Sequence, residues 1–266
     1  MYSFNYHRPD SIDAARQLFE QAEDGIYLAG GQTLIPTMKQ RLAAPSDVVD
    51  LASIRELRGL SVEGGTVRVG AFVRHAEVAA DADVRRALPA LAALAGMIGD
   101  PQVRNRGTLG GSVANSDPAA DYPAAVVGLG ATIRTSGRSI AADDFFQDLF
   151  ETALTPGEII VGIDFPVPRR AAYRKFPNPA SRYAVVGVMV AEFDGGIRVG
   201  ITGAAGCAFR GTALEQALNE RLDPAVVEQV EVPEAGFNSD LHASADYRAH
   251  LVKVMARRAV ADLLRR

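Results

Sequence analysis

Two pairs of adjacent glycines carry the clearest chemical signal in the sequence. Gly30-Gly31 lies within the stretch 28–34, and Gly110-Gly111 lies within the stretch 106–121. Paired glycines let the backbone turn with positive φ and bring bare N–H groups against a ligand. Successive N–H groups in such a turn form a concave site that holds an anion without a lysine. Two such loops therefore predict a ligand with two phosphates, such as a dinucleotide.

Polar side chains distinguish these two glycine pairs from ordinary turns. Hydroxyl, amide and carboxyl groups crowd around them: Thr33, Thr108, Ser112, Asn115, Ser116, Asp117 and Asp121. A single glycine pair more often marks a tight turn. Gly64-Gly65 and Gly195-Gly196 lack such a group of polar neighbours, so they are predicted to be plain hairpin turns.

Two familiar nucleotide-binding motifs are excluded. Gly128-Leu-Gly130 lacks the third glycine of the dinucleotide fingerprint. It also lies between a predicted helix and the strand after it, whereas the fingerprint needs a strand, a turn and then a helix. No Gly-x4-Gly-Lys-Ser/Thr run occurs in the sequence, which removes the P-loop.

Charge and cysteine content exclude further classes of function. The 266 residues carry a net charge of −4, which argues against nucleic acid as a main partner because phosphate backbones need a basic field. The single cysteine, Cys207, excludes a disulfide within the chain and is predicted to be a small buried residue. An iron–sulfur cluster normally needs four protein ligands, mostly cysteine. Any cluster that serves this chain therefore belongs to another polypeptide.

No residue pattern assigns catalytic chemistry to the chain. The sequence contains no recognisable nucleophile–base pair or pair of carboxylates, and its four histidines are scattered rather than clustered as a zinc site requires. His75 is predicted to cap or to pack, with contact to a cofactor as the alternative. This pattern fits a protein whose cofactor carries out the chemistry while the chain supplies binding and orientation. We accordingly predict no catalytic residues and no metal site.

Hydrophobic periodicity predicts a chain of mixed helices and strands. Strands are expected at 4–7, 26–29, 47–51, 131–135 and 157–165, and hairpins at 60–70 and 184–204. Helices are expected after the start signal Pro9-Asp-Ser11 and at 34–42, 75–80, 84–98, 121–129 and 245–264. The basic residues of the last helix, including Arg248, are expected to form a solvated face.

Proline content predicts a domain boundary. Pro166, Pro168, Pro177 and Pro179 form the only proline-dense stretch of the chain. Domain boundaries fall in such linkers. We therefore expect a first domain at 1–168 and a second at 169–266.

The N-terminal residues carry no targeting signal that we recognise. Residues 1–8 lack the basic and then apolar pattern of a signal peptide. No apolar run reaches the length needed to span a bilayer. We therefore predict a cytoplasmic protein without a transmembrane segment.

Both glycine loops resemble those of a known family. Residues 28–42, LAGGQTLIPTMKQRL, look like the first flavin loop of the FAD-binding medium subunits of molybdenum hydroxylases, the carbon monoxide dehydrogenase and xanthine dehydrogenase type enzymes. Residues 100–121, DPQVRNRGTLGGSVANSDPAAD, look like the second flavin loop. Residues 173–176, 183–187 and 244–248 resemble the C-terminal domain, so the likeness runs nearly end to end.

This resemblance implies a fold and a function. The fold would be α+β, with a two-lobed FAD-binding domain of the vanillyl-alcohol-oxidase or PCMH type followed by a smaller α+β C-terminal domain. The chain would be the electron-transfer subunit of an oxidoreductase complex. Electrons from iron–sulfur clusters of a partner would pass through FAD to an external acceptor such as a quinone, NAD, oxygen or a cytochrome. The partners would be a small 2Fe-2S subunit and a large molybdopterin subunit, assembled as a dimer of heterotrimers.

The resemblance also implies which residues contact FAD. Tyr183 matches an aromatic residue that stacks on the isoalloxazine, Lys175 matches a flavin-proximal lysine, and Asp121 matches a carboxylate that contacts the cofactor. By residue type alone, a core position for Tyr183 and a helix cap for Asp121 are the alternatives. The complete predicted set is Ala29, Gly30, Gly31, Gln32, Thr33, Leu34, Ile98, Thr108, Gly110, Gly111, Ser112, Asn115, Asp117, Asp121, Ile160, Lys175 and Tyr183.

Two other functions are alternatives. A self-contained flavin reductase on the same scaffold would need an internal proton donor and a basic nucleotide-sugar site, and the sequence offers no clear candidate for either. A non-redox accessory protein could keep the fold for assembly or FAD delivery. The intact glycine loops with Thr108 and Asn115 argue against that second alternative, because such loops have no use without a ligand.

Overall fold

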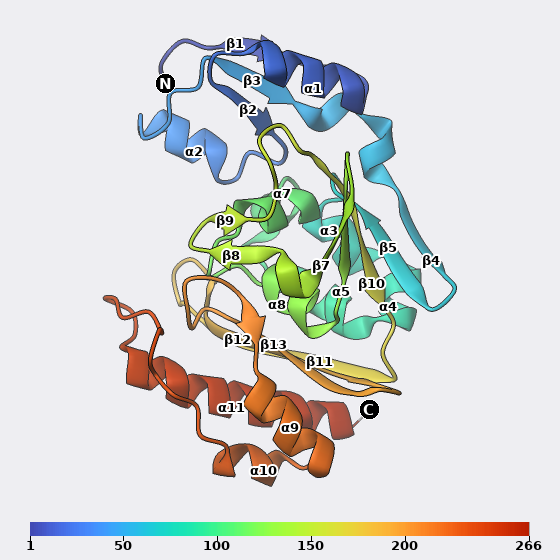
Figure 1. Ribbon diagram of the computed structural model, residues 1–266, viewed down its shortest axis with the longest axis vertical. Coiled ribbons are helices and arrows are strands. Elements are labelled where there is room, and N and C mark those ends of the chain that lie inside the picture. The colour runs from blue at the N-terminus through green and yellow to red at the C-terminus, as the bar shows by residue number, and fades with distance from the viewer. Residues whose placement is uncertain (266) are drawn as a thin grey trace.

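The computed structural model describes residues 1–265 and confirms the predicted α+β fold. Figure 1 shows three parts stacked along the longest axis: a small N-terminal lobe, a larger central lobe and a C-terminal sheet with helices on its outer side. None of the helices described in residues 1–265 combines the length and the apolar character that crossing a membrane requires.

The N-terminal lobe is a parallel three-stranded sheet in the order β1-β3-β2. Its elements are β1 (Asn5–His7), α1 (Ile12–Gln21), β2 (Gly25–Leu28), α2 (Leu34–Lys39) and β3 (Asp47–Asp50). Ser11 caps α1 by accepting a hydrogen bond from the backbone N–H of Ala14, as the predicted start signal requires. Two short 3-10 helices, η1 (Leu51–Ser53) and η2 (Arg55–Arg58), lead into the central lobe.

The central lobe is built on an antiparallel five-stranded sheet in the order β4-β5-β10-β6-β7. These strands are β4 (Leu60–Glu63), β5 (Thr66–Gly70), β6 (Thr132–Thr135), β7 (Ser139–Ala141) and β10 (Ile160–Pro166). Gly64 and Gly65 join β4 to β5 with φ of 57° and 73°, so the predicted plain hairpin turn is confirmed. The 3-10 helix η3 (Ala142–Asp144) and the small hairpin of β8 (Phe146–Asp148) and β9 (Glu151–Thr152) connect β7 to β10.

Six short helices accompany this sheet. They are α3 (His75–Ala80), α4 (Ala82–Ala87), α5 (Pro89–Gly96), α6 (Pro101–Arg104), α7 (Leu109–Asn115) and α8 (Tyr122–Gly128). The single helix predicted over 84–98 is wrong, because the chain breaks at Leu88, which has φ −141° and ψ 65°. Pro89 disfavours helical geometry at the residue before it and starts the next helix at its first position.

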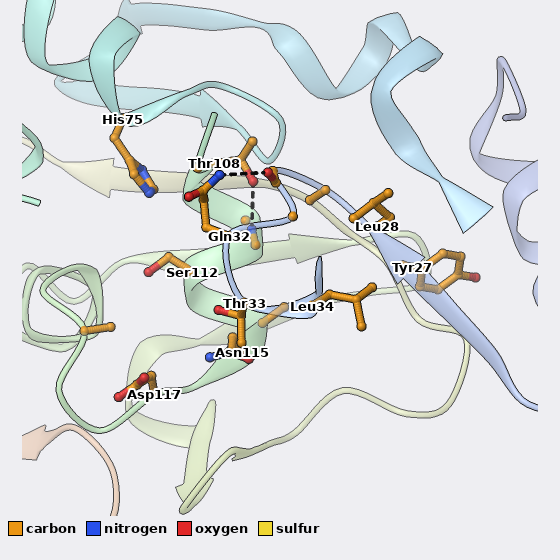
Figure 2. Close-up of a pocket in the computed structure, with 18 of the residues that line it drawn as sticks. Tyr27, Leu28, Gln32, Thr33, Leu34, His75, Thr108, Ser112, Asn115 and Asp117 are labelled. Atoms are coloured by element: carbon orange, nitrogen blue, oxygen red, sulfur yellow. Dashed lines mark hydrogen bonds between the residues drawn. The ribbon is translucent and has the colours of Figure 1, made fainter. Parts of the chain in front are cut away.

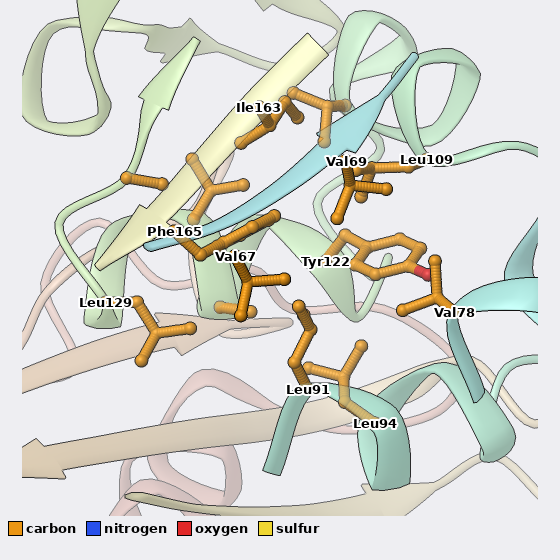
Figure 3. Packing of buried hydrophobic residues seen from close by; sticks show 14 of the residues in the cluster. Val67, Val69, Val78, Leu91, Leu94, Leu109, Tyr122, Leu129, Ile163 and Phe165 are labelled. Carbon is orange, nitrogen blue, oxygen red and sulfur yellow. The ribbon is translucent and has the colours of Figure 1, made fainter. Parts of the chain in front are cut away.

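The core of the central lobe lies between this sheet and its helices. Figure 3 shows Tyr122 of α8 surrounded by Val69, Val78 and Leu109. These side chains are fully or almost fully buried. Tyr122 thereby fixes α8 directly after Asp121, the predicted site residue at the helix start.

The C-terminal sheet is buried on both faces. Its order is β11-β12-β13-β14, with β11 (Arg170–Pro177), β12 (Ala184–Phe193), β13 (Gly196–Thr202) and β14 (Phe209–Arg210). Side chains alternate along a strand, so Tyr173 and Met189 pack into the central core while Ala172 and Val188 pack toward the outer helices. Those helices are α9 (Thr212–Glu220), α10 (Pro224–Gln229) and α11 (Ala245–Leu264).

Arg248 on α11 does not belong to a solvated face. Its side chain is only 5% exposed and donates to the carbonyls of Val185 and Gly203, at 2.7 Å each, and to Asp240 at 2.8 Å. The prediction was wrong for this residue because a helical pattern does not reveal which carbonyls a neighbouring sheet presents. Arg248 instead ties α11 to the end of the C-terminal sheet.

Candidate functional site

A cavity of about 620 Å³ brings the predicted site residues together. It lies where the N-terminal lobe meets the central lobe, and the loop between β11 and β12 reaches its rim. Sixteen of the predicted residues line it: Ala29, Gly30, Gly31, Gln32, Thr33, Leu34, Ile98, Thr108, Gly110, Gly111, Ser112, Asn115, Asp117, Asp121, Ile160 and Tyr183. Only Lys175 among the predicted residues is not part of the lining.

The first glycine loop lines this cavity and carries backbone donors without a protein partner. Gly31 has φ 72°, the left-handed conformation that the sequence predicts for a glycine turn. Within residues 1–265, none of the backbone N–H groups from Gly30 to Leu34 donates to a protein acceptor. A run of unpaired N–H groups is what an anion site of the nest type requires.

The second glycine loop is a helix start rather than a turn. Thr108 is the N-cap of α7, and its hydroxyl accepts from the N–H of Gly111 at 3.2 Å. The N–H groups of Leu109, Gly110 and Ser112 also donate within the protein. The prediction of a positive-φ turn with bare N–H groups is therefore wrong here; positive φ occurs at Ser116, where α7 ends.

Close packing explains the glycines of the second loop. A Cβ on Gly110 would lie 2.5 Å from Cβ of Ala71, and one on Gly111 would lie 2.8 Å from Oγ1 of Thr108 and 3.4 Å from Cβ of Ala29. A larger residue at Gly110 would push α7 away from the central sheet. One at Gly111 would displace the capping hydroxyl and narrow the space toward the first loop.

One face of α7 lines the cavity with polar side chains. Thr108, Ser112 and Asn115 are spaced by four and three residues, which places them on one side of the helix (Figure 2). Asp117 follows the turn at Ser116, where its carboxylate accepts from the N–H of Ala119 at 2.9 Å. Burial raises the pKa of Asp117, and the hydrogen bond to Ala119 opposes that change.

Asp121 sits in a buried polar cluster at one end of the cavity. Its carboxylate accepts from the Tyr173 hydroxyl at 2.6 Å and from Nζ of Lys175 at 2.9 Å. Burial raises the pKa of Asp121, while the Lys175 ammonium and the Tyr173 hydrogen bond oppose that effect. Although Asp121 is the N-cap of α8, its side chain makes no capping hydrogen bond. The helix-cap alternative does not describe this carboxylate.

His75 is part of the cavity wall, although it does not belong to the predicted set. The residue is 4% exposed, and its Nδ1 has no hydrogen-bond partner in the described chain. Its ring lies 5.3 Å from the ring of Tyr122. Burial, followed by the charge of Arg104, lowers the pKa of His75 to about 4, so the imidazole is neutral at physiological pH.

The rim of the cavity includes residues that sequence reasoning missed. Tyr183 is 41% exposed there, and its neighbours Ser181 and Arg182 line the cavity with it. Glu158 and Leu154 approach from the segment before β10. Ser181 and Arg182 are close to Tyr183 in the sequence, and Leu154 and Glu158 are close to Ile160. This closeness to predicted site residues could have identified them. Cys207, predicted to be buried, is only half-buried, and it lies outside the cavity lining.

The lining carries few charged side chains and no metal-binding group among the described residues. Residues 1–265 contain no group of three or more His, Cys, Asp or Glu side chains that could hold a metal ion. Among residues 1–265, Arg182 is the only arginine of the lining, and no lysine belongs to it. A ligand with two phosphates would therefore depend on backbone donors such as those of Gly30 to Leu34.

A family model for the FAD-binding domain in molybdopterin dehydrogenases matches residues 2–168. The chain therefore belongs to this family. Its cofactor is FAD, and the chain is an oxidoreductase component of the molybdenum hydroxylase type. The lining fits FAD because it combines unpaired backbone N–H donors from Gly30 to Leu34 with the apolar surface of Ile98 and Ile160 and the aromatic side chain of Tyr183.

Individual relatives are similar along their whole length. The carbon monoxide dehydrogenase medium chain of Afipia carboxidovorans is 38% identical over 282 residues, covering 97% of this chain and 96% of the relative. The nicotine 6-hydroxylase medium subunit of Paenarthrobacter nicotinovorans is 36% identical over 276 residues, covering 98% and 97%.

Solved structures show the same fold. A chain of Cu,Mo-CO dehydrogenase in its cyanide-inactivated form superposes with a TM-score of 0.91 at 35% identity, covering 99% of this chain and 98% of that chain. A chain of quinoline 2-oxidoreductase from Pseudomonas putida 86 superposes with a TM-score of 0.90 at 30% identity, covering 99% and 97%.

Proposed function

We propose that this chain holds FAD in the cavity between its lobes and relays electrons from iron–sulfur clusters of a partner subunit to an external acceptor. The observation that carries this proposal is the unpaired run of N–H groups from Gly30 to Leu34, in a loop that lines the same cavity as α7. These donors would hold the pyrophosphate, while Ser112 and Asn115 would contact neighbouring polar groups of FAD.

The isoalloxazine would lie at the other end of the lining, beside Tyr183. Ile98 and Ile160 supply apolar surface, and Tyr183 supplies an aromatic face at the rim. Bound FAD supplies the chemistry of accepting electrons singly and releasing them as a pair. The chain binds and orients the cofactor and leaves one edge of the cavity accessible at Tyr183.

The composition of the chain supports placing the iron–sulfur cluster on a partner subunit. The chain has one cysteine, so it cannot supply the ligands of an iron–sulfur cluster. We propose a small 2Fe-2S subunit and a large molybdopterin subunit as partners, in a dimer of heterotrimers. Several relatives are named as medium chains or medium subunits, which supports such an assembly. Within this chain, we propose an FAD-binding domain at 1–168 and a second domain at 169–266.

Affinity purification from the native cells tests this proposal. A tag on this chain should recover FAD together with iron and molybdenum, in proteins of the two proposed classes. Recovery of the FAD-loaded chain without iron or molybdenum would favour a self-contained flavin reductase. Recovery without FAD would favour the accessory-protein alternative.

A further inference from the structure

Lys175 uses every donor of its ammonium group within the protein. Nζ donates to Oδ2 of Asp121 at 2.9 Å, to the carbonyl of Arg182 at 2.7 Å and to the carbonyl of Met97 at 3.1 Å. Its side chain is 4% exposed, the same fraction as that of Asp121. A lysine has three donors, so this one keeps none for a ligand. That arrangement explains why Lys175 is absent from the cavity lining.

The three acceptors belong to three different segments around the cavity. Asp121 lies at the start of α8, and Met97 follows α5 directly before Ile98. Arg182 belongs to the loop between β11 and β12 and precedes Tyr183 in the chain. Lys175 therefore joins the central lobe to the loop that carries the aromatic residue of the rim.

The loop around Arg182 has an unfavourable backbone conformation that hydrogen bonds must hold in place. Arg182 has φ 63°, a left-handed conformation that is unfavourable for a residue with a side chain. Local hydrogen bonds close the loop: N–H of Asn178 donates to the Tyr183 carbonyl at 2.7 Å, and N–H of Arg182 donates to the Asn178 carbonyl at 2.9 Å. Lys175 binds the carbonyl of the peptide that leads directly into Tyr183.

We infer that Lys175 is a positioning residue that fixes Tyr183 at the cavity rim by tying the Arg182 carbonyl to Asp121 and Met97. This inference refines the proposed function, since it assigns the orientation of the proposed flavin-stacking residue to a lysine that does not itself touch the cavity. It predicts that removing the Lys175 ammonium group changes the position of Tyr183 even in the FAD-free chain. The inference can therefore be tested separately from FAD binding.

The absence of tryptophan from the chain makes a direct test possible. Tyr183→Trp introduces one tryptophan at the rim, and its emission and quenching by acrylamide report its exposure. In the full-length FAD-free chain, adding Lys175→Met should shift the emission to longer wavelength and increase quenching. Arg170→Met is the matched control. Arg170 lies on β11 like Lys175, at the end of the strand away from the loop, and the change removes its ion pair with Glu192 of β12. It should change neither signal.

A second comparison separates positioning from simple loss of a buried ion pair. Lys175→Met alone leaves the Asp121 carboxylate buried without its counter-ion, and this could unfold the chain. Asp121→Asn in the tryptophan background keeps Lys175 and its two carbonyl bonds, so the emission should stay unchanged. Lys175→Met combined with Asp121→Asn removes both charges and should still expose the tryptophan.

The outcomes distinguish this inference from the proposed function. Equal quenching in the parent and in the folded double variant would overturn the positioning role of Lys175. In the Tyr183 background, FAD affinity should fall roughly tenfold in the double variant relative to Asp121→Asn, the effect of losing a charge-assisted hydrogen bond to the loop. Failure of the unaltered chain to bind FAD would overturn the proposed function and leave the tryptophan comparison valid.

Discussion

Gly30 and the carbonyl oxygen of Arg106 are in such close contact that a Cβ built on Gly30 would lie 2.3 Å from that oxygen. The same Cβ would lie 2.7 Å from Cα of Gly107, so both neighbours are backbone atoms that cannot rotate away. The two glycine loops thus touch each other where the N-terminal lobe meets the central lobe. Gly30 is required for close approach of two backbones, whereas Gly31 is required for its positive φ.

Gly30→Ala is therefore expected to force the two loops apart. We predict a decrease in the free energy of unfolding of about 1–3 kcal/mol, the usual cost of overpacking. FAD binding should weaken at the same time, because the donors from Gly30 to Leu34 move with the loop. Chemical denaturation and titration with FAD measure the two effects.

Gly59→Ala is the control for that substitution. Gly59 has φ −71°, and a Cβ there would meet nothing within 4 Å. Its free energy of unfolding should stay within about 0.5 kcal/mol of the parent. If Gly30→Ala behaved like Gly59→Ala in both measurements, the contact between the loops would not be a determinant of the cavity.

Gly111→Val tests the second loop. The added side chain would displace the capping hydroxyl of Thr108 and fill the space toward Ala29. We predict loss of FAD binding with retention of the fold, because Gly111 faces the cavity rather than the core. Far-UV circular dichroism and flavin absorbance after gel filtration check this. Full FAD affinity in the variant would show that the loop has only a structural role.

The pH dependence of the free energy of unfolding should report the burial of the His75 imidazole. Burial lowers its pKa from 6.5 to about 4, so only the unfolded chain takes up this proton between those values. The free energy of unfolding should therefore decrease as the pH falls from about 6.5 to about 4, with a contribution from His75 of up to roughly 3 kcal/mol. In His75→Leu the decrease over this range should be smaller. Parallel pH profiles for the two proteins would refute the burial of a neutral imidazole.

The flavin should be bound without a covalent link. Covalent attachment to flavins uses His, Cys or Tyr, and neither 30–33 nor 107–117 contains one of these residues. Acid precipitation of the FAD-loaded chain should leave all of the flavin in the supernatant. Flavin that stays with the pellet would point to His75 or to a tyrosine of the cavity wall.

Local signals in the sequence predicted most of the elements. The hairpin at Gly64-Gly65 and the helix starting at Ser11 depend on turn and cap residues that act over a few positions, so they could be read directly. The helix expected over 84–98 was wrong because Pro89 disfavours helical geometry at Leu88 and divides the alanine-rich run into two helices.

The sequence predicted which residues share one cavity but not how they contact one another. Resemblance to the family supplied positions from Ala29 to Tyr183 that line one cavity. The occupied N–H groups of the second loop, the three acceptors of Lys175 and the buried Arg248 depend on contacts between distant segments. Such contacts leave no periodic pattern in the sequence, so only the folded chain reveals them.

Reduction of the flavin by substrate tests the central claim most directly. The FAD-loaded chain, alone or in its co-purified complex, is mixed anaerobically with carbon monoxide, nicotine and quinoline, compounds named in the relatives, and with the substrate identified for the complex. Visible absorbance of the flavin is followed in each mixture. The account predicts bleaching only in the complex, because in the proposed assembly the iron–sulfur cluster and the substrate site belong to the partner subunits. Bleaching of the isolated chain by any of these substrates would contradict the electron-transfer role.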